Sequence, residues 1–329
     1  MLSSAVLSSI KDYGAVGDGE HDDTKPIQYA IDYLSGEGGG TLYFPKGTYS
    51  VSNPIFKKAN VNLFGETMFT TIFQWQSNSS GAILDTSNQN LMGTSIENFT
   101  FTKNIDIEAE VTGILGGSKL NVYNSSLGSF KNLNFANLDN GIKGNAEPGG
   151  VGIFDSYFEN IFCSRCRRGI WLFGSGNTLV HIKIMQCTIS GLVLDWLDEE
   201  SFDGVHLIGG IFVRNRTDIL IPNVNGIRPC NFIGTWFEQS ELGVIDITNK
   251  GTRVMNLTFR DCMLNTSSKE HSLLNVINAK GIVNVDNCTV VQHIQNGNIS
   301  IDCPAENDSK LIIKNIQGYM FDGSSFNIN

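Results

Sequence analysis

The chain has 329 residues, of which 41% are hydrophobic and only 17% are charged, and its formal net charge is −10. A pI near 5.0 argues against the basic surface that nonspecific nucleic-acid binding requires, so we expect no nucleic-acid partner. No apolar run of the sequence reaches the ~20 residues that span a bilayer, so we expect no membrane insertion.

The first predicted element is a helix that begins within residues 13–32, "YGAVGDGEHDDTKPIQYAID". Asp22, Asp23 and Thr24 can accept hydrogen bonds from the first-turn N–H groups, which is typical of a helix N-terminus. Apolar residues then recur at helical spacing, at Ile27, Ala30, Ile31 and Leu34. The acid-rich turn offers oxygen ligands for calcium, but the EF-hand spacing with its distal Glu is absent. We therefore interpret the turn as the start of a helix with one buried face.

After this helix, apolar and polar residues alternate between Asn-rich turns, as in "IENFTFTKN" and "HIKIMQCTISGLVLDW", which predicts strands. The pattern recurs about nine times at intervals of roughly 21 to 34 residues, which indicates a solenoid, because one coil cannot bury its own apolar face. The frame of a leucine-rich repeat is absent. The sequence therefore predicts an all-β parallel β-helix, with the N-terminal α-helix capping the unpaired strands of the first coil.

The seven cysteines show no paired spacing beyond one C-x-x-C, formed by Cys163 and Cys166. One such pair is at most half of a zinc site. We therefore expect the cysteines to be mostly small buried apolar residues, and we predict neither a metal nor a cofactor. Stacking of successive repeats would place Cys166 on Cys187, about 4.8 Å apart.

Two N-terminal stretches, "IKDYGAVGDGEHDDTKPIQYAID" and "GGGTLYFPKGTYSV", carry a family resemblance. They resemble the amino-terminal signature of the pectate-lyase-superfamily right-handed β-helix, found in bacteriophage tailspike depolymerases for capsular polysaccharide and in some exo-glucanases. The resemblance implies a right-handed parallel β-helix solenoid, with a cap in residues 1–60 and the β-helix body in residues 61–329. It also implies a homotrimer that cleaves or binds a bacterial surface polysaccharide, on a virion (phage tail) or in another extracellular location.

The signature holds no catalytic residues, so the candidate chemistry comes from carboxylates in the repeats. Most glycoside hydrolases use two carboxyl groups, about 5 to 5.5 Å apart for retention or 6.5 to 9.5 Å for inversion. Strands about 4.8 Å apart place acids of adjacent or next-adjacent coils within either range. The segments "LDWLDEESFDG" and "TWFEQSE" combine such acids with tryptophan. We predict Glu238 as the general acid, desolvated by Trp236 and Phe237, and Asp198 or Asp203 as the base or nucleophile.

Aromatic, acidic and basic side chains near these acids supply the predicted substrate-binding residues. A tryptophan ring covers the apolar face of a sugar, and an arginine grips a carboxylate through two N–H groups. The predicted binding residues are Trp196, Trp236, Glu199, Glu200, Arg214 and Arg216. A second basic group, Arg165, Arg167 and Arg168, precedes Arg214 and Arg216 by about two coils. The alternative is that these charged residues only line solvated turns.

Three functions stay open at this point. The preferred one is hydrolysis of a capsule, exopolysaccharide or O-antigen. A non-catalytic glycan-binding spike or adhesin would hold a glycan on the same face, and a polysaccharide lyase would use Arg or Lys to abstract the proton beside a uronate.

The candidates for burial between the chains of a trimer are Trp75, Trp171, Trp196 and Trp236.

Overall fold

A computed structural model of the protein shows a chain dominated by short strands. It describes residues 7–87, 93–117, 127–144, 152–174, 176–195, 201–202, 204–222, 226–227, 229–247, 252–266, 273–275, 279–292, 301–302, 310–320 and 325–326. Contacts divide the chain into Met1–Cys166, here called unit 1, and Arg167–Asn329, here called unit 2. The predicted boundary between cap and body near residue 60 remains a prediction. Within the described residues, no helix has the length and hydropathy of a membrane span.

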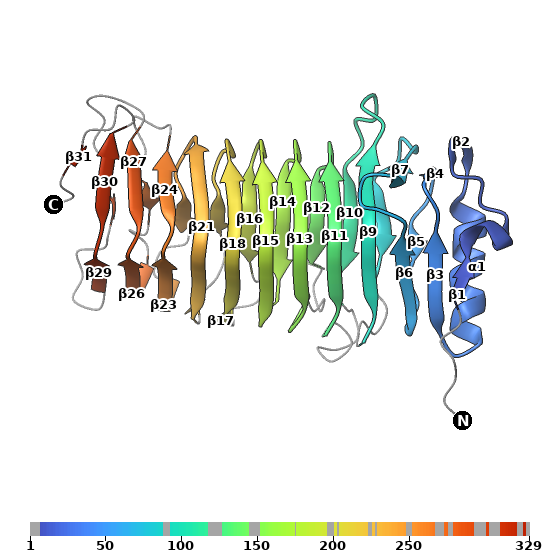
Figure 1. Ribbon diagram of the computed structural model, residues 1–329, viewed down its shortest axis with the longest axis horizontal. Coiled ribbons are helices and arrows are strands. Elements are labelled where there is room, and N and C mark those ends of the chain that lie inside the picture. Colours follow the sequence, from blue (N-terminus) through green and yellow to red (C-terminus); the bar gives the residue numbers. More distant parts are fainter. Residues whose placement is uncertain are drawn as a thin grey trace. The chain divides into compact units, whose positions relative to one another are not determined.

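Unit 1 is a parallel β-helix whose coils contribute strands to two sheets (Figure 1). Its long sheet contains β1 (Leu7–Ser9), β2 (Asp18–Asp22), β3 (Gly40–Phe44), β4 (Gly47–Val51), β6 (Val61–Gly65), β7 (Thr71–Trp75), β9 (Ser95–Lys103), β11 (Ser129–Ala136) and β13 (Tyr157–Ser164). Its short sheet contains β5 (Ile55–Phe56), β8 (Gly81–Asp85), β10 (Val111–Gly116) and β12 (Asn140–Gly144). Neighbouring strands pair in parallel, as β11 does with β9 and β13.

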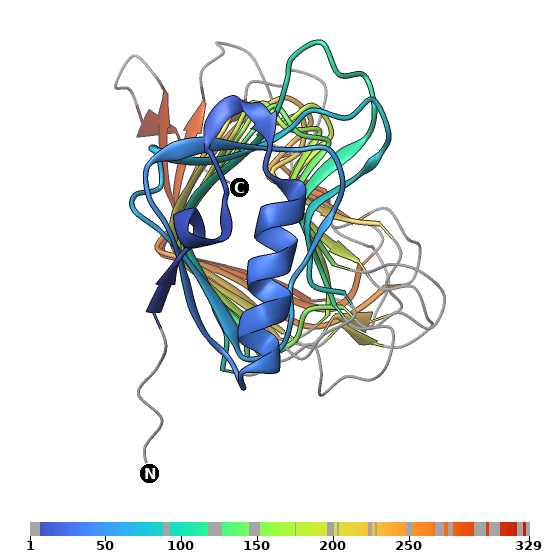
Figure 2. The ribbon, with the colours of Figure 1, turned by 90° about the vertical axis from the view of Figure 1, so that its right-hand side faces the viewer.

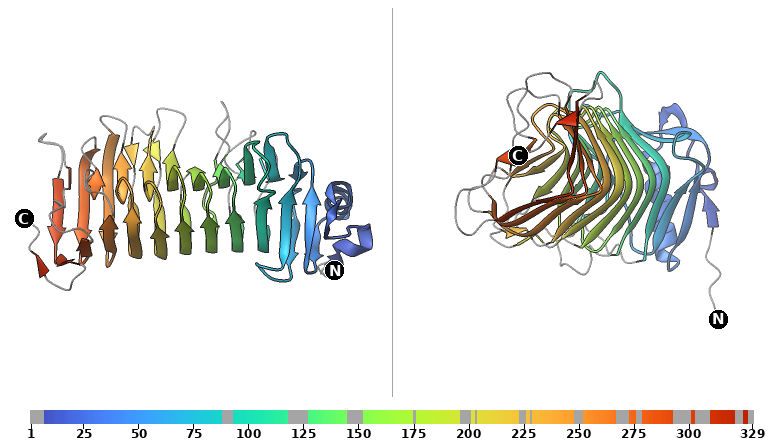
Figure 3. Two further views of the ribbon diagram at one scale, coloured as in Figure 1. Left: turned by 90° about the horizontal axis from the view of Figure 1, so that it is seen from above. Right: turned by 60° about the vertical axis from the view of Figure 1, so that its left-hand side comes forward.

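Unit 2 is built in the same way, and Figure 3 shows the strands of each unit stacked side by side. Its long sheet contains β15 (Asn177–Met185), β17 (Ser201–Phe202), β18 (Val205–Val213), β20 (Gly226–Ile227), β21 (Cys230–Ser240), β23 (Thr252–Arg260), β24 (Met263–Thr266), β26 (Ala279–Asp286), β27 (Thr289–Gln292), β29 (Lys310–Lys314), β30 (Gln317–Met320) and β31 (Ser325–Phe326). Its short sheet contains β14 (Arg168–Phe173), β16 (Ser190–Asp195), β19 (Ile219–Ile221), β22 (Ile245–Ile247), β25 (Leu274–Asn275) and β28 (Ile301–Asp302). The predicted all-β parallel β-helix is thus confirmed.

An asparagine ladder marks the bend in the long strands of unit 1. Asn98, Asn132 and Asn160 have φ values of 67°, 51° and 53°, in the left-handed region that asparagine tolerates better than most residues. The Asn132 amide donates to Asn98 Oδ1 at 2.9 Å, and the Asn160 amide donates to Asn132 Oδ1 at 2.8 Å. The asparagines at these bends therefore have a structural role, because they bend each coil and bond it to the next.

The interior of unit 1 is filled by aromatic rings that stack from coil to coil. Phe101 stacks on Phe73 and on Phe135, with ring centroids 5.5 and 5.2 Å apart. Phe130 and Phe158 form a second column, with centroids 4.8 Å apart and planes inclined by 6°. Such pairs add favourable ring contacts to the burial of apolar surface, so they hold successive coils in register.

The helix α1 (Thr24–Gly36) covers the end of the first coils of unit 1, as Figure 2 shows. Its predicted apolar stripe is fully buried and consists of Ile27, Ala30, Ile31 and Leu34. Gln28 makes a second contact with this end: its amide nitrogen donates to the Phe56 carbonyl oxygen at 3.0 Å, and the Phe56 N–H donates to Gln28 Oε1 at 2.7 Å. The helix therefore satisfies backbone groups at the edge of the short sheet, and the predicted capping role is confirmed.

The acid turn before α1 uses its two aspartates differently. Asp22 Oδ1 accepts the Thr24 N–H at 3.0 Å, as expected of a residue that caps a helix. Asp23 was expected to do the same, but this expectation is wrong. Its carboxylate accepts the N–H groups of Val16 and Gly17 at 2.6 and 2.9 Å instead. The glycine turn folds back over the helix start and presents these donors, so Asp23 ties the turn to the helix.

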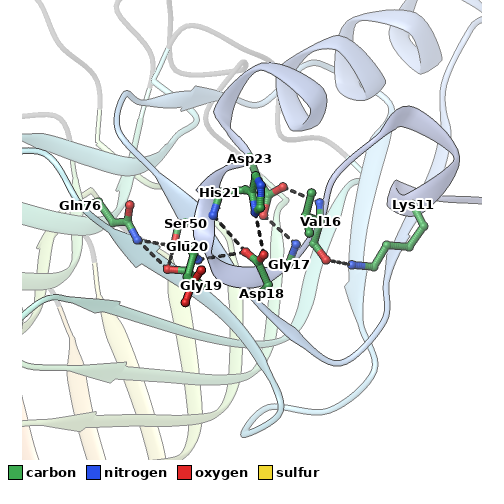
Figure 4. A network of polar contacts seen from close by, with 10 residues as sticks. All are labelled: Lys11, Val16, Gly17, Asp18, Gly19, Glu20, His21, Asp23, Ser50 and Gln76. Atoms are coloured by element: carbon green, nitrogen blue, oxygen red, sulfur yellow. Dashed lines mark hydrogen bonds and ion pairs between the residues drawn. The ribbon is translucent and has the colours of Figure 1, made fainter.

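The same turn contains a network of polar contacts, shown in Figure 4. Asp18 accepts the N–H of His21 and lies 2.6 Å from its ring Nδ1. These contacts hold the pKa of Asp18 well below its usual range, and the Asp18 carboxylate raises the pKa of His21. Ser50 and Gln76 both donate to the Gly19 carbonyl oxygen at 2.8 Å. The contacts run from the turn to later coils, which supports a structural role for the motif.

The described cysteines are all buried free thiols, as the sequence predicted; they are Cys163, Cys166, Cys187, Cys230, Cys262 and Cys288. Cys262 and Cys288 occupy corresponding positions on neighbouring coils of unit 2. Burial raises the pKa of Cys166 to about 12 and so suppresses the reactive thiolate. Cys166 and Cys187 belong to different units, and their stacking remains a prediction.

Trp75 is buried, which contradicts the expectation that its ring is exposed for contact between chains. It ends β7 with only 1% of its surface exposed, and its indole N–H donates to the Ser79 carbonyl oxygen at 3.2 Å. The alternation of side chains along β7 turns Trp75 into the coil together with Phe73. Trp75 therefore does not offer its ring to another chain.

Candidate functional site

Strand β21 places two of the predicted site residues, Trp236 and Glu238, on the outer side of unit 2. Trp236 is 45% exposed and Glu238 is half-buried, whereas Phe237 between them is fully buried. Phe237 packs inside the coil against Phe212, with ring centroids 5.1 Å apart. The predicted desolvation of Glu238 by Phe237 is therefore wrong, because the two side chains point to opposite faces of the strand. Trp236 and Glu238 share one face.

Arg214 follows β18 and lies beside Glu238 on the neighbouring strand. Val213 pairs with Glu238, and the Arg214 N–H donates to the Glu238 carbonyl oxygen at 2.9 Å. The side-chain Nε of Arg214 donates to Gln239 Oε1 at 2.8 Å. This bond orients the exposed guanidinium group along the bend that follows the two strands.

Arg216 lies two residues further along the same bend and is also exposed. Its N–H donates to the Cys187 carbonyl oxygen at 2.9 Å, and its carbonyl oxygen accepts the Leu242 N–H at 2.7 Å. The predicted site residues that the structure brings together near the ends of β18 and β21 are Trp236, Glu238, Arg214 and Arg216. The other predicted site residues, Trp196, Asp198, Glu199, Glu200 and Asp203, lie outside the residues whose side chains are described.

A second group in unit 2, here called the β14–β16 cluster, consists of Arg168, Trp171, Phe173 and Asp195. Strands β14 and β16 pair in parallel with Phe173 opposite Asp195. The Trp171 indole N–H donates to Asp195 Oδ2 at 3.2 Å, and the Arg168 guanidinium carbon lies 4.3 Å from the Trp171 ring centroid. The rings of Trp171 and Phe173 have centroids 5.2 Å apart. An aromatic surface, a cation and a carboxylate therefore converge on one short sheet.

The β14–β16 cluster has the chemistry of a sugar-binding site. Trp171 is partly exposed, so its ring offers an apolar surface on which a sugar can stack. Arg168 lies over the ring as a cation–π partner, and Asp195, only 3% exposed, fixes the ring through the indole N–H.

The sequence predicted Arg168, Trp171 and Asp195 only in separate roles, as part of a basic group, a chain interface and an acid run. The missed signal is the alignment of "RGIWLF" with "SGLVLD" as successive repeats. That alignment places the end of one strand against the end of the next, which is the observed pairing of β14 with β16.

A third carboxyl group has a perturbed pKa but is inaccessible. Asp218 is fully buried in unit 2, and its Oδ1 accepts the side-chain amide of Asn215 at 2.9 Å. Burial raises the pKa of Asp218 well above its usual value. Perturbed pKa values are a common sign of a functional site, but a carboxyl group inside the coil cannot meet a polymer. Across the described part of the chain, no three His, Cys, Asp or Glu side chains are placed to hold a metal ion.

Comparison with known proteins identifies the family. A family model described as "Rhamnogalacturonase A/epimerase, pectate lyase-like" matches residues 7–188, which is more than half of the chain. The chain belongs to this family. The match extends well beyond the N-terminal signature and confirms the predicted resemblance to the pectate-lyase superfamily.

Curated relatives of this family member match shorter stretches. Plasmin and fibronectin-binding protein A of Streptococcus pneumoniae is 57% identical over 56 residues, which cover 17% of this chain and 8% of the relative. Alginate lyase 7 of Azotobacter vinelandii is 36% identical over 121 residues, which cover 33% of this chain and 14% of the relative. The chain thus spans only 8% and 14% of the lengths of these two relatives.

Two solved structures share the fold of this family member at low sequence identity. The A-module of mannuronan C-5 epimerase AlgE6 from Azotobacter vinelandii has a TM-score of 0.57 and 16% identity, and the match covers 95% of each chain. The tailspike protein of Acinetobacter baumannii phage AM24 has a TM-score of 0.61 and 12% identity, covering 97% of this chain and 55% of the tailspike. Identities this low show a common fold alone.

Proposed function

We propose that the protein is a depolymerase of the phage tailspike type that hydrolyses glycosidic bonds of a bacterial surface polysaccharide, namely a capsule, an exopolysaccharide or an O-antigen. The observation that carries the proposal is the position of Trp236 and Glu238 on one outer face, beside Arg214. An exposed ring and a cation beside a carboxyl group are suited to hold a sugar, and a carboxyl group is the usual acid of a glycosidase. Membership of the pectate lyase-like family and the fold shared with a phage tailspike support a polysaccharide as the substrate.

In the proposed reaction, Glu238 protonates the glycosidic oxygen of the leaving group. Asp198 or Asp203 either attacks the anomeric carbon as the leaving group departs, forming a glycosyl ester that water then hydrolyses with Glu238 as the base, or activates a water molecule that attacks this carbon directly. Trp236 and Trp196 cover the apolar faces of the sugar rings. The polar binding residues donate to or accept from the hydroxyl and carboxylate groups; they are Arg214, Arg216, Glu199 and Glu200.

The β14–β16 cluster supports a second placement of the sugar-binding surface, on the short sheet. There Trp171 would hold the sugar, and the buried Asp195 would position its ring through the indole N–H. The two placements differ in which tryptophan is essential, Trp236 or Trp171, so mutagenesis separates them.

We further propose a homotrimer located on a phage tail or outside the cell. Ile211 is 37% exposed, and register places it beside Trp236, at the edge of the face proposed to hold the sugar. An exposed apolar side chain at this edge is suited to contact between chains that leaves Trp236 open to the sugar. Light scattering on the full chain is expected to give the mass of a trimer, and a monomer at micromolar concentration would contradict the assembly.

Two competing functions have specific support. The 57% identical stretch shared with plasmin and fibronectin-binding protein A favours a binding role, which for this chain would be that of a non-catalytic glycan-binding spike or adhesin. The 36% identical stretch shared with alginate lyase 7 favours a lyase acting on a polymer that contains uronate. A lyase leaves an unsaturated uronate, a hydrolase leaves a new reducing end without it, and an adhesin leaves neither.

The test is to incubate the protein with a panel of bacterial capsules and O-antigens and to measure reducing ends together with the absorbance of unsaturated uronate. On a polymer that the wild type hydrolyses, Glu238→Gln is expected to lower turnover by about 10²–10⁴-fold, the usual effect of losing a general acid. Glu20→Gln, an exposed Glu of the N-terminal turn, is the matched control and should be fully active. If Glu238→Gln and Asp203→Asn both retain full activity, this catalytic assignment fails, and weaker binding of the polymer by Trp171→Ala but not by Trp236→Ala then places the sugar at the β14–β16 cluster.

A further inference from the structure

A column of side chains on the long sheet of unit 1 changes from aromatic to charged along successive coils. Strand register places Tyr43 beside Phe64, which is followed in turn by Glu97, Lys131 and Glu159. The residue before each of these five is buried, so the alternation along the strands turns all five outward. We call this column the unit 1 ladder.

The aromatic end of the unit 1 ladder forms a small platform. The rings of Tyr43 and Phe64 have centroids 6.4 Å apart and planes inclined by only 31°, and Phe64 is 38% exposed. The corresponding positions of unit 2, one residue before the bend of each long strand, hold aliphatic residues at Val180, Ile208 and Ile233 and charged residues at Arg260, Asp286 and Lys314. The fold therefore accepts an aliphatic side chain at this position, and the exposed rings of unit 1 are not a requirement of the coil.

The charged end of the unit 1 ladder offers hydrogen-bonding groups. Lys131 Nζ lies 3.6 Å from Glu159 Oε2, with 36% and 38% of the two side chains exposed. The same ammonium group lies 5.6 Å from the ring centroid of Tyr157, itself 36% exposed. Exposed ion pairs contribute only about 0–1 kcal/mol to stability, so a ligand hydroxyl can compete for these two groups at little cost. Glu97 adds a second carboxylate to the column.

We infer that the unit 1 ladder is an additional glycan-binding surface, made of residues other than those proposed for cleavage, and that it holds an uncharged stretch of a polysaccharide. Tyr43 and Phe64 would stack on sugar rings, and the carboxylates and the ammonium group would bond to hydroxyls. Two carboxylates against one cation disfavour a polyanion at this surface. Neighbouring coils are about 4.8 Å apart, a step comparable with the advance of one sugar residue in an extended glycan.

The inference rests on the proposed function only in that the ligand is a glycan. Its consequence is that glycan binding through the unit 1 ladder persists in variants that lack the residues proposed for cleavage. A binding measurement tests it without any turnover.

The probe is an array of bacterial surface glycans with uncharged and uronate-containing members, followed by affinity electrophoresis in a polymer that the wild type retains. Phe64→Ala and Tyr43→Ala are each expected to raise the Kd for an uncharged glycan by roughly three- to tenfold, which is the range for losing one ring contact. Phe64→Tyr keeps a ring and should bind like the wild type. Ile208→Ala is the matched control, because it removes an exposed apolar side chain at a corresponding position, 45% exposed against 38% for Phe64, without removing a ring.

Three results would overturn the inference: unchanged retention of the Tyr43→Ala/Phe64→Ala double variant, equal loss in Ile208→Ala, or wild-type binding confined to uronate-containing glycans. Circular dichroism and thermal unfolding of each variant identify any loss that comes from misfolding, and in that case Phe64→Leu, which is apolar without a ring, replaces the alanine variant. Binding that depends on these rings, without release of reducing ends, would refute the proposed hydrolase and support the unit 1 ladder as a binding surface. Hydrolysis with binding that is unchanged in the ring variants would support the hydrolase and refute the unit 1 ladder as a binding surface.

Discussion

The side-chain amide of Asn215 donates to the Asp218 carboxyl at 2.9 Å inside unit 2, where both residues are fully buried. Asn215 also accepts the Cys187 N–H at 2.9 Å and donates to the Ile184 carbonyl oxygen at 3.1 Å. Burial raises the pKa of Asp218 because a charged carboxylate loses its hydration inside the coil, and the bond from Asn215 offsets this loss only in part.

The first prediction follows from this raised pKa. The folded protein holds the Asp218 proton more tightly than the unfolded chain, so stability is greatest below the unfolded pKa of about 3.9 and is lost as pH rises towards the folded value. The loss amounts to about 1.4 kcal/mol per pH unit between the two pKa values. Asp218→Asn, which cannot ionise, should remove this decline. Urea unfolding between pH 4.5 and 7.5 tests the prediction, with the exposed Asp261→Asn as control; parallel pH profiles for the wild type and Asp218→Asn would contradict it.

The second prediction concerns Lys57, which is fully buried at the end of the short sheet of unit 1. Its ammonium group donates to the Lys58 carbonyl oxygen at 3.1 Å, and burial lowers the pKa of Lys57 to about 7. A depressed lysine pKa gives stability that is complete above the unfolded pKa of about 10.4 and is lost as pH falls towards 7. Lys57→Met should therefore stabilise the protein at pH 7 by roughly 2–4 kcal/mol.

Chemical unfolding at pH 7 and pH 9.5 measures this effect, and the advantage of Lys57→Met should shrink at the higher pH. Lys58→Met is the matched control, because Lys58 is exposed and its Nζ lies 3.8 Å from Asp32 Oδ1. A destabilised Lys57→Met protein at pH 7 would show that the ammonium group is better accommodated than its burial indicates.

The third prediction concerns the centre of the asparagine ladder. Asn132 combines a φ of 51° with amide bonds to Asn98 and Asn160. Asn132→Ala loses both bonds and strains the left-handed backbone, so it should cost about 2–3 kcal/mol of the free energy of unfolding. Asn132→Gly loses the bonds but tolerates the backbone, so it should cost about 1 kcal/mol less. Equal losses for the two variants in urea unfolding would exclude backbone strain as a cause.

The sequence was sufficient for the fold because the relevant information is local and repeated. The alternation along each strand and the helical stripe from Ile27 to Leu34 both depend on spacing alone, and both are confirmed. The same rule, applied strictly, also places Trp236 and Glu238 on one face and Phe237 on the other. Asp23 was misassigned because its partners, Val16 and Gly17, are donors created by a turn whose direction the sequence pattern does not reveal.

The candidate site was less predictable because it depends on register between coils. Asp195 meets Trp171 only because β14 and β16 pair without a shift, and the segment between such strands can change length and move the pairing. Arg214 reaches the end of β21 for the same reason. Neither contact has a signature within one repeat, so both appear only when the strands are aligned in space.

The last prediction concerns the contact between α1 and the edge of the short sheet. The Gln28 side chain makes the two backbone bonds that a neighbouring strand would make at this edge, because its amide both donates to and accepts from the backbone of Phe56. Gln28→Ala leaves these backbone groups without that partner and should cost about 1–3 kcal/mol. Gln28→Glu can still accept the Phe56 N–H but cannot donate to its carbonyl oxygen, so it should fall between the wild type and Gln28→Ala. Hydrogen exchange at the Phe56 amide reports the contact directly: exchange should be fastest in Gln28→Ala, and unchanged protection there would show that the apolar stripe of α1 caps the coil without Gln28.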